Sequence, residues 1–74
     1  MSKTIAFFDS GIGGIPYLDN LRNIAPDLNY IYLADTENFP YGIKSGEEIR
    51  KIVLSCVSRL IEKTAPDIIV IACN

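Results

Sequence analysis

A thiol and a carboxylate each follow an apolar segment of this 74-residue chain. The aliphatic run 68–71 leads to Cys73 and Asn74, and the segment 4–8 leads to Asp9. A thiol suits proton transfer because its pKa, about 8.5, is readily shifted toward neutrality. Cys73 could also be a small core residue, since cysteine is often buried for packing alone. Its position beside Asn74, directly after an apolar run, favours a functional thiol.

The stretch DSGIGG, residues 9–14, has the composition of a turn that binds an anion. Its glycines allow close backbone approach, and free amides at the start of a following helix attract negative charge. The simplest alternative is a strand-to-helix turn without a ligand. A second alternative is a small flavodoxin-like module that binds FMN or another phosphate ligand here, although the stretch lacks the lysine of a phosphate loop. Asp9 would repel phosphate and accept an ammonium group, which favours an amino acid as the ligand.

These residues must be positioned by strands and helices that alternate along the chain. Residues 4–8, 30–33 and the stretch from Asp67 onward are apolar and rich in β-branched or aromatic side chains, which predicts three strands. The first intervening helix is predicted to begin near Pro16 and to stop at Pro26. The second is predicted to follow a capping box formed by Ser45 and Glu48, and to end at 65–66.

The predicted fold is α/β, with a β-α-β-α-β unit of the flavodoxin-like kind. The strands are apolar at consecutive positions, which is typical of parallel strands buried on both faces. Right-handed crossovers and the order 2-1-3 would place the two helices on opposite faces of the sheet. The site would then lie at the carboxyl ends of strands one and three, where Asp9 and Cys73 meet. Cys56 lies within the apolar helical stripe 49–61, which predicts a core role.

Composition narrows the classes of function. A net charge of −2 and the lack of a basic stripe argue against nucleic-acid binding. No stretch approaches the roughly 18 apolar residues of a membrane span, and the N-terminus does not read as a signal peptide. Two cysteines without framework spacing predict reduced thiols and a cytoplasmic protein. Histidine is absent, so we expect no metal site.

Three separated motifs resemble one family. FDSGIGG (8–14), IYLADTENFPYGIKS (31–45) and VIACN (70–74) are similar, in order and spacing, to the amino-terminal part of glutamate racemase. The resemblance implies that residues 1–74 are the amino-terminal part of the first α/β domain of a two-domain isomerase. It also implies conversion of L-glutamate to D-glutamate for peptidoglycan, and hence for cell-wall biogenesis and cell shape, without a cofactor.

The resemblance assigns roles to several residues. Racemisation removes the α-proton from one face and returns a proton to the other, so it needs a base on each face. Cys73 would be one base, and the second would lie in the other domain, so this chain alone should be inactive. The residues implied to assist Cys73 or line the glutamate site are Asp9, Ser10, Tyr41, Gly42 and Asn74. An uncovered sheet edge and uncovered helix faces further predict a homo-oligomer.

Overall fold

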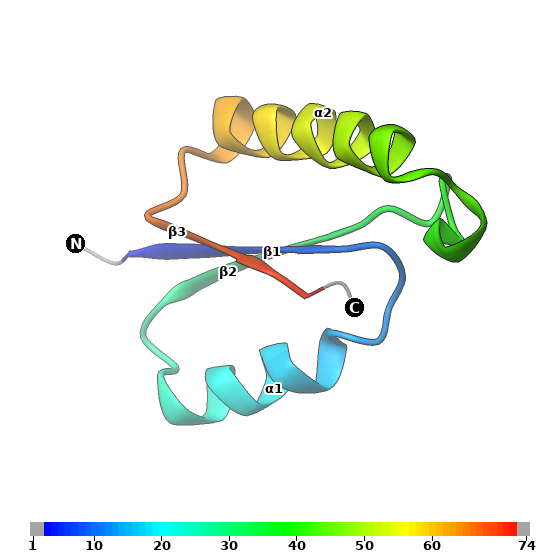
Figure 1. Cartoon of the computed structure of the whole chain (residues 1–74). Coiled ribbons are helices and arrows are strands. Elements are labelled where there is room, and N and C mark those ends of the chain that lie inside the picture. Colours follow the sequence, from blue (N-terminus) through cyan, green and yellow to red (C-terminus); the bar gives the residue numbers. More distant parts are fainter. Residues whose placement is uncertain (1–2, 73–74) are drawn as a thin grey trace.

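The computed structural model describes residues 3–72. Strands and helices alternate along the chain as predicted from the sequence (Figure 1). The elements are β1 (Thr4–Asp9), α1 (Ile15–Ile24), β2 (Asn29–Ala34), the 3-10 helix η1 (Tyr41–Ile43), α2 (Gly46–Thr64) and β3 (Ile68–Ile71). The three strands form one parallel sheet with the order β2-β1-β3, which confirms the predicted α/β architecture and strand order.

The two helices cover opposite faces of the sheet, with β1 as its central strand (Figure 1). Successive side chains of a strand point to opposite faces. Ala6 and Phe8 of β1 therefore share one face, where they pack into a core cluster with Cys56 and Leu60 of α2. Phe7 points to the other face and is also buried. Cys56 is only 3% exposed, in agreement with its predicted core role.

Local signals explain where the helices begin and end. The Ser45 side chain accepts a hydrogen bond from the Glu48 backbone amide at 3.1 Å, which is the serine half of the predicted capping box. Pro16 lies in the first turn of α1, where an amide donor is not needed. The C-cap residue of α2 is Ala65, which has a left-handed φ of 43°. This conformation is unfavourable for residues that have a Cβ.

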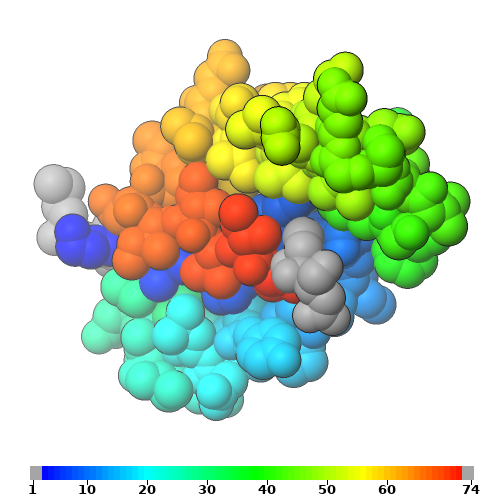
Figure 2. Space-filling view, in the orientation of Figure 1, coloured from blue at the N-terminus to red at the C-terminus, as the bar shows by residue number. Residues whose placement is uncertain are grey.

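Strand β3 presents an open, apolar edge. In Figure 2 its surface lies uncovered between α2 above and α1 below. Ile68 and Ile71 of β3 are more than half exposed, and so are Leu54 and Ile61 of α2. Such an edge favours association between chains. The homo-oligomer predicted from the sequence stays a prediction. Among residues 3–72, no helix is long and apolar enough to cross a membrane.

Candidate functional site

Several residues predicted to form the site line one cavity at the carboxyl edge of the sheet. The cavity has a volume of about 490 Å³. Its lining includes four of the predicted residues, namely Asp9, Ser10, Tyr41 and Gly42. Cys73 and Asn74 lie outside the described residues. Ala72, which directly precedes Cys73, lines the same cavity, and its amide donates to the Phe8 carbonyl at 2.8 Å. The segment that follows β3 therefore reaches this cavity at Ala72.

The Asp9 carboxylate is buried and accepts hydrogen bonds on both of its oxygens from the protein. Its side chain is 4% exposed. One oxygen, Oδ2, accepts from the Gly14 amide at 2.7 Å and from the Tyr32 hydroxyl. The other, Oδ1, accepts from the Gly11 amide at 3.1 Å. The anion that the glycine-rich turn was expected to attract is thus, at these two amides, the carboxylate of Asp9 itself.

These contacts determine the charge of Asp9. Burial raises the pKa of the Asp9 carboxyl, whereas hydrogen bonds from the Tyr32 hydroxyl and from the amides of Gly14, Gly11 and Ser10 lower it. The net result is a pKa below its usual value, so Asp9 is an anion at neutral pH. A carboxylate of lowered pKa is a poor acceptor for a thiol proton. Asp9 is suited to hold positive charge and orient donors instead.

At Gly14 the glycine-rich turn packs closely against Asp9 of β1 and Tyr32 of β2. A Cβ at this position would lie 2.8 Å from the Ala72 Cβ, 2.8 Å from the Tyr32 hydroxyl oxygen and 2.9 Å from Asp9 Oδ2. Real Cβ atoms do not approach other atoms so closely. The absent side chain lets the Gly14 amide reach Asp9 at the amino end of α1.

A second buried carboxylate holds the loop that closes the cavity. Asp35 follows β2 and is 8% exposed. It accepts hydrogen bonds from the Asn38 side-chain amide, 3.1 Å from each oxygen, and from the Tyr41 hydroxyl. The Phe39 ring packs 3.5 Å from the position that a Cβ on Gly11 would occupy. Asp35 therefore fixes residues 38–41 against the glycine-rich turn.

Comparison with known proteins gives the same family from sequence and from structure. No family model matches the chain. A glutamate racemase of Clostridium botulinum is 44% identical over 73 residues, 99% of this chain and 28% of the relative. One of Photorhabdus laumondii is 46% identical over 71 residues, 96% of this chain and 25% of the relative. The solved glutamate racemase from Aquifex pyrophilus superposes with a TM-score of 0.88 at 43% identity, over 95% of this chain and 27% of that one.

This chain is therefore similar, over almost its whole length, to one segment of the glutamate racemases that it matches. It spans about a quarter of the length of the relatives that it matches. The comparison confirms the resemblance inferred from the three motifs and the isomerase class of the homologues. The FMN-binding alternative is not favoured, because Asp9 already takes the amides of Gly11 and Gly14 that a phosphate would use.

Two residues of this candidate site were not singled out from the sequence. Tyr32 donates to Asp9, and Asp35 accepts from Tyr41. The sequence alone offered one indication that Tyr32 contacts a polar group. Its hydroxyl on a half-buried strand needs a partner, and residue 32 is a diagonal neighbour of residue 9 in the register that pairs Ala34 with Asp9. That register is not visible in the sequence alone.

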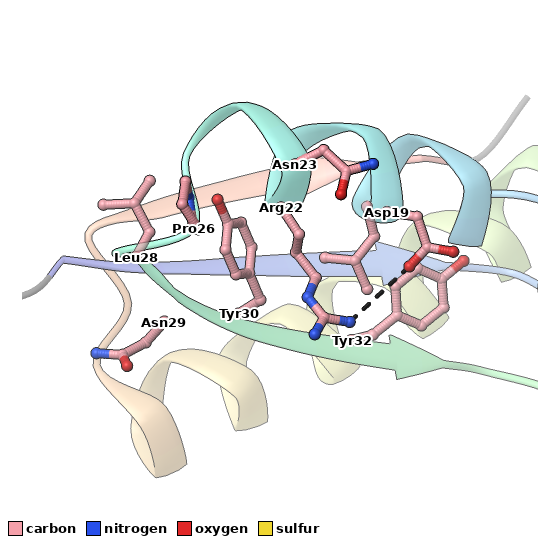
Figure 3. Close-up of a pocket in the computed structure, with 9 residues that line it drawn as sticks. Asp19, Arg22, Asn23, Pro26, Leu28, Asn29, Tyr30 and Tyr32 are labelled. Atoms are coloured by element: carbon pink, nitrogen blue, oxygen red, sulfur yellow. Dashed lines mark ion pairs between the residues drawn. The ribbon is translucent and has the colours of Figure 1, made fainter.

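A larger hollow lies elsewhere and collects none of the predicted residues. It has a volume of about 770 Å³ and runs between α1 and β2, past Arg22, Tyr30 and Tyr32 (Figure 3). Its one ion pair joins Arg22 to Asp19 at 3.9 Å, with both side chains more than half exposed, so it contributes little. Within residues 3–72, no group of histidine, cysteine or acidic side chains could hold a metal ion.

Proposed function

We propose that this chain forms one side of a glutamate racemase active site, as the amino-terminal part of the first α/β domain of a two-domain enzyme. The observation that carries the proposal is the cavity at the carboxyl edge of the sheet. Asp9, Ser10, Tyr41 and Gly42 line it together with Ala72, the residue before Cys73. The similarity to glutamate racemases along almost the whole chain supports the same assignment.

The proposed reaction is an exchange of protons at Cα of glutamate. The Cys73 thiolate takes the α-proton from one face, and the electron pair of the broken C–H bond stays on the substrate, delocalised into its carboxylate. On the opposite face a second cysteine, supplied from outside these 74 residues and protonated at this stage, donates its thiol proton to Cα. Cys56 cannot be that base, because it is 3% exposed within the core cluster under α2. Two cysteine bases suffice for this route, and no cofactor takes part.

Charge and burial suggest how the remaining residues contribute. As an anion at the cavity wall, Asp9 attracts the ammonium group of glutamate and so orients Cα toward Cys73. Ser10, Gly42 and Asn74 line the substrate site and supply polar contacts. Tyr41 lines the same cavity, while its hydroxyl donates to Asp35, which keeps its ring in place.

A chimeric enzyme tests this function. The 74 residues would replace the aligned segment of the Aquifex pyrophilus racemase, which is 43% identical over 95% of this chain. We expect the chimera to interconvert L- and D-glutamate in a circular-dichroism assay. Cys73→Ala should lower the rate by at least about 100-fold, as expected for loss of a proton-transfer group. Cys56→Ala is the matched control and should keep activity. Equal rates for the chimera and its Cys73→Ala variant would refute the proposal.

The 74-residue chain alone should not racemise glutamate. It contains two cysteines, and Cys56 is buried, so it offers one thiol to one face of the substrate. Turnover of L-glutamate above the uncatalysed rate by the purified chain would contradict the two-base mechanism. In the cell we place the complete enzyme in the cytoplasm, where it would supply D-glutamate for peptidoglycan and so serve cell-wall biogenesis and cell shape.

A further inference from the structure

Tyr32 connects the outer groove of the domain to the candidate site. It lies on β2, and its ring lines the groove between α1 and β2 (Figure 3). The ring stacks on Phe7 with centroids 6.1 Å apart and an interplanar angle of 20°. From that position the hydroxyl donates a hydrogen bond to Oδ2 of Asp9. The ring is thus held by packing, and the hydroxyl is directed at the site.

Two donors from different elements converge on the same oxygen of Asp9. The Gly14 amide, at the amino end of α1, and the Tyr32 hydroxyl, on β2, both donate to Oδ2. The Gly11 amide donates to Oδ1. Rotation of the carboxylate about its Cβ–Cγ bond would break these bonds together. The plane of the carboxylate is therefore fixed relative to the cavity that Asp9 lines.

We propose that Tyr32 is a positioning residue that orients the Asp9 carboxylate for its contact with the substrate. Its importance for catalysis rests on the proposed function. The contact between Tyr32 and Asp9 does not, because it is a property of this chain alone. The two parts can therefore be tested separately.

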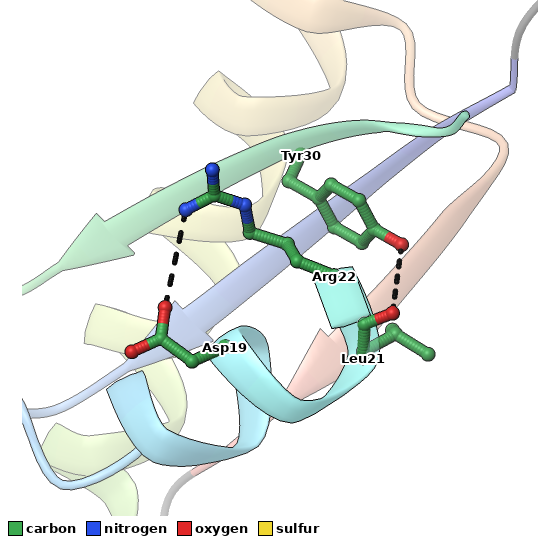
Figure 4. Close-up of polar contacts among 4 residues, drawn as sticks. All are labelled: Asp19, Leu21, Arg22 and Tyr30. Atoms are coloured by element: carbon green, nitrogen blue, oxygen red, sulfur yellow. Dashed lines mark hydrogen bonds and ion pairs between the residues drawn. The ribbon is translucent and has the colours of Figure 1, made fainter. Parts of the chain in front are cut away.

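The same strand offers a matched control. Tyr30 precedes Tyr32 by two residues, so both side chains point to the face covered by α1. The Tyr30 hydroxyl donates to the backbone carbonyl of Leu21 in α1 at 3.3 Å (Figure 4). It also donates to the carbonyl of Ala25, which follows α1, at 2.5 Å. Removing either hydroxyl deletes one half-buried donor from β2, but of the two only Tyr32 donates to Asp9.

Titration of Asp9 by NMR tests the proposal directly. The side-chain carboxyl ¹³C shift of Asp9 would be followed from pH 7 downward in the wild-type chain, in Tyr32→Phe and in Tyr30→Phe. We expect the pKa of Asp9 to rise in Tyr32→Phe, because a hydrogen bond to the ionised form is lost, and to stay unchanged in Tyr30→Phe. An Asp9 pKa in Tyr32→Phe equal to that of the wild type would overturn the proposal.

A second measurement needs no variant. The ring ¹³Cζ shift of Tyr32 in the wild-type chain should change at the pKa of Asp9, while that of Tyr30 should not. A Tyr32 shift that ignores the Asp9 titration would refute the contact even where Tyr32→Phe fails to fold. In the active chimera, Tyr32→Phe should move the acid limb of the kcat/KM profile upward in pH. If the pKa of Asp9 rises in Tyr32→Phe but the acid limb of the kcat/KM profile does not move, the hydrogen bond from Tyr32 to Asp9 is supported and the role of Asp9 in the reaction is refuted.

Discussion

Replacing Gly14 with alanine tests how tightly the glycine-rich turn is packed. The new Cβ would lie 2.8–2.9 Å from Ala72, Tyr32 and Asp9. Ala72 is held by its hydrogen bond to the Phe8 carbonyl, so it cannot simply retreat. Relief must move the turn away from Asp9, which strains the bond from the Gly14 amide. Overpacking costs about 1–3 kcal/mol, and a weakened hydrogen bond to a charged group adds to it. We expect Gly14→Ala to lower the free energy of unfolding by about 2–4 kcal/mol.

The assay is urea denaturation followed by circular dichroism. With a slope of about 2 kcal/mol per molar urea, in the middle of the usual range, the midpoint should fall by about 1–2 M. Gly13→Ala is the matched control, because nothing lies within 4 Å of a Cβ at that position and no described glycine has a positive φ. It should change stability by about 0.5 kcal/mol or less. Equal midpoints for the two variants would show that the close approach at Gly14 does not exist.

Three further predictions concern other parts of the chain. Ala65→Gly should stabilise the protein by about 0.5–1 kcal/mol in urea denaturation, since glycine adopts the left-handed φ of 43° without a Cβ penalty, and a loss of stability would contradict this. The pKa of Asp9 is lowered on folding, so the ionised carboxylate stabilises the folded chain above the unfolded pKa of about 4, and this stabilisation is lost as pH falls through the folded pKa. The urea midpoint of the wild type should therefore fall more steeply with acid than that of Asp9→Asn. Parallel pH profiles for the two proteins would refute this prediction. Ile71→Lys, at the edge of β3, should shift a self-associated chain toward monomer in light scattering. Ile43 is 82% exposed on η1, and Ile43→Lys is the control that should leave the association unchanged. A monomeric wild-type chain would contradict the predicted homo-oligomer.

Much of the fold could be predicted because its signals are local. Ser45 begins α2, Pro16 lies in the first turn of α1, and the consecutive apolar residues of the strands indicate a doubly covered parallel sheet. The meeting of Asp9 with residues 41–42 at one cavity follows from the shared carboxyl edge of parallel strands together with the loop after β2.

The chemistry around Asp9 could not be predicted in the same way. It depends on the register between β1 and β2, which makes Tyr32 a diagonal neighbour of Asp9, and on the close approach of Gly14 to Ala72. Contacts of this kind join residues far apart in the sequence and leave no periodic pattern. Without them the glycine-rich turn reads as a site for an external anion, whereas Asp9 itself accepts from the amides of Gly11 and Gly14.

The most direct test of the proposed chemistry is deuterium incorporation at Cα of glutamate. The active chimera would be incubated with L-glutamate in D₂O, and the α-proton signal would be followed by NMR alongside the D-glutamate formed. Proton transfer through Cys73 predicts that the D-glutamate carries solvent deuterium, and that Cys73→Ala abolishes formation of deuterated D-glutamate while Cys56→Ala preserves it. Undiminished formation of deuterated D-glutamate by the Cys73→Ala chimera would contradict the role of Cys73 as one of the two bases.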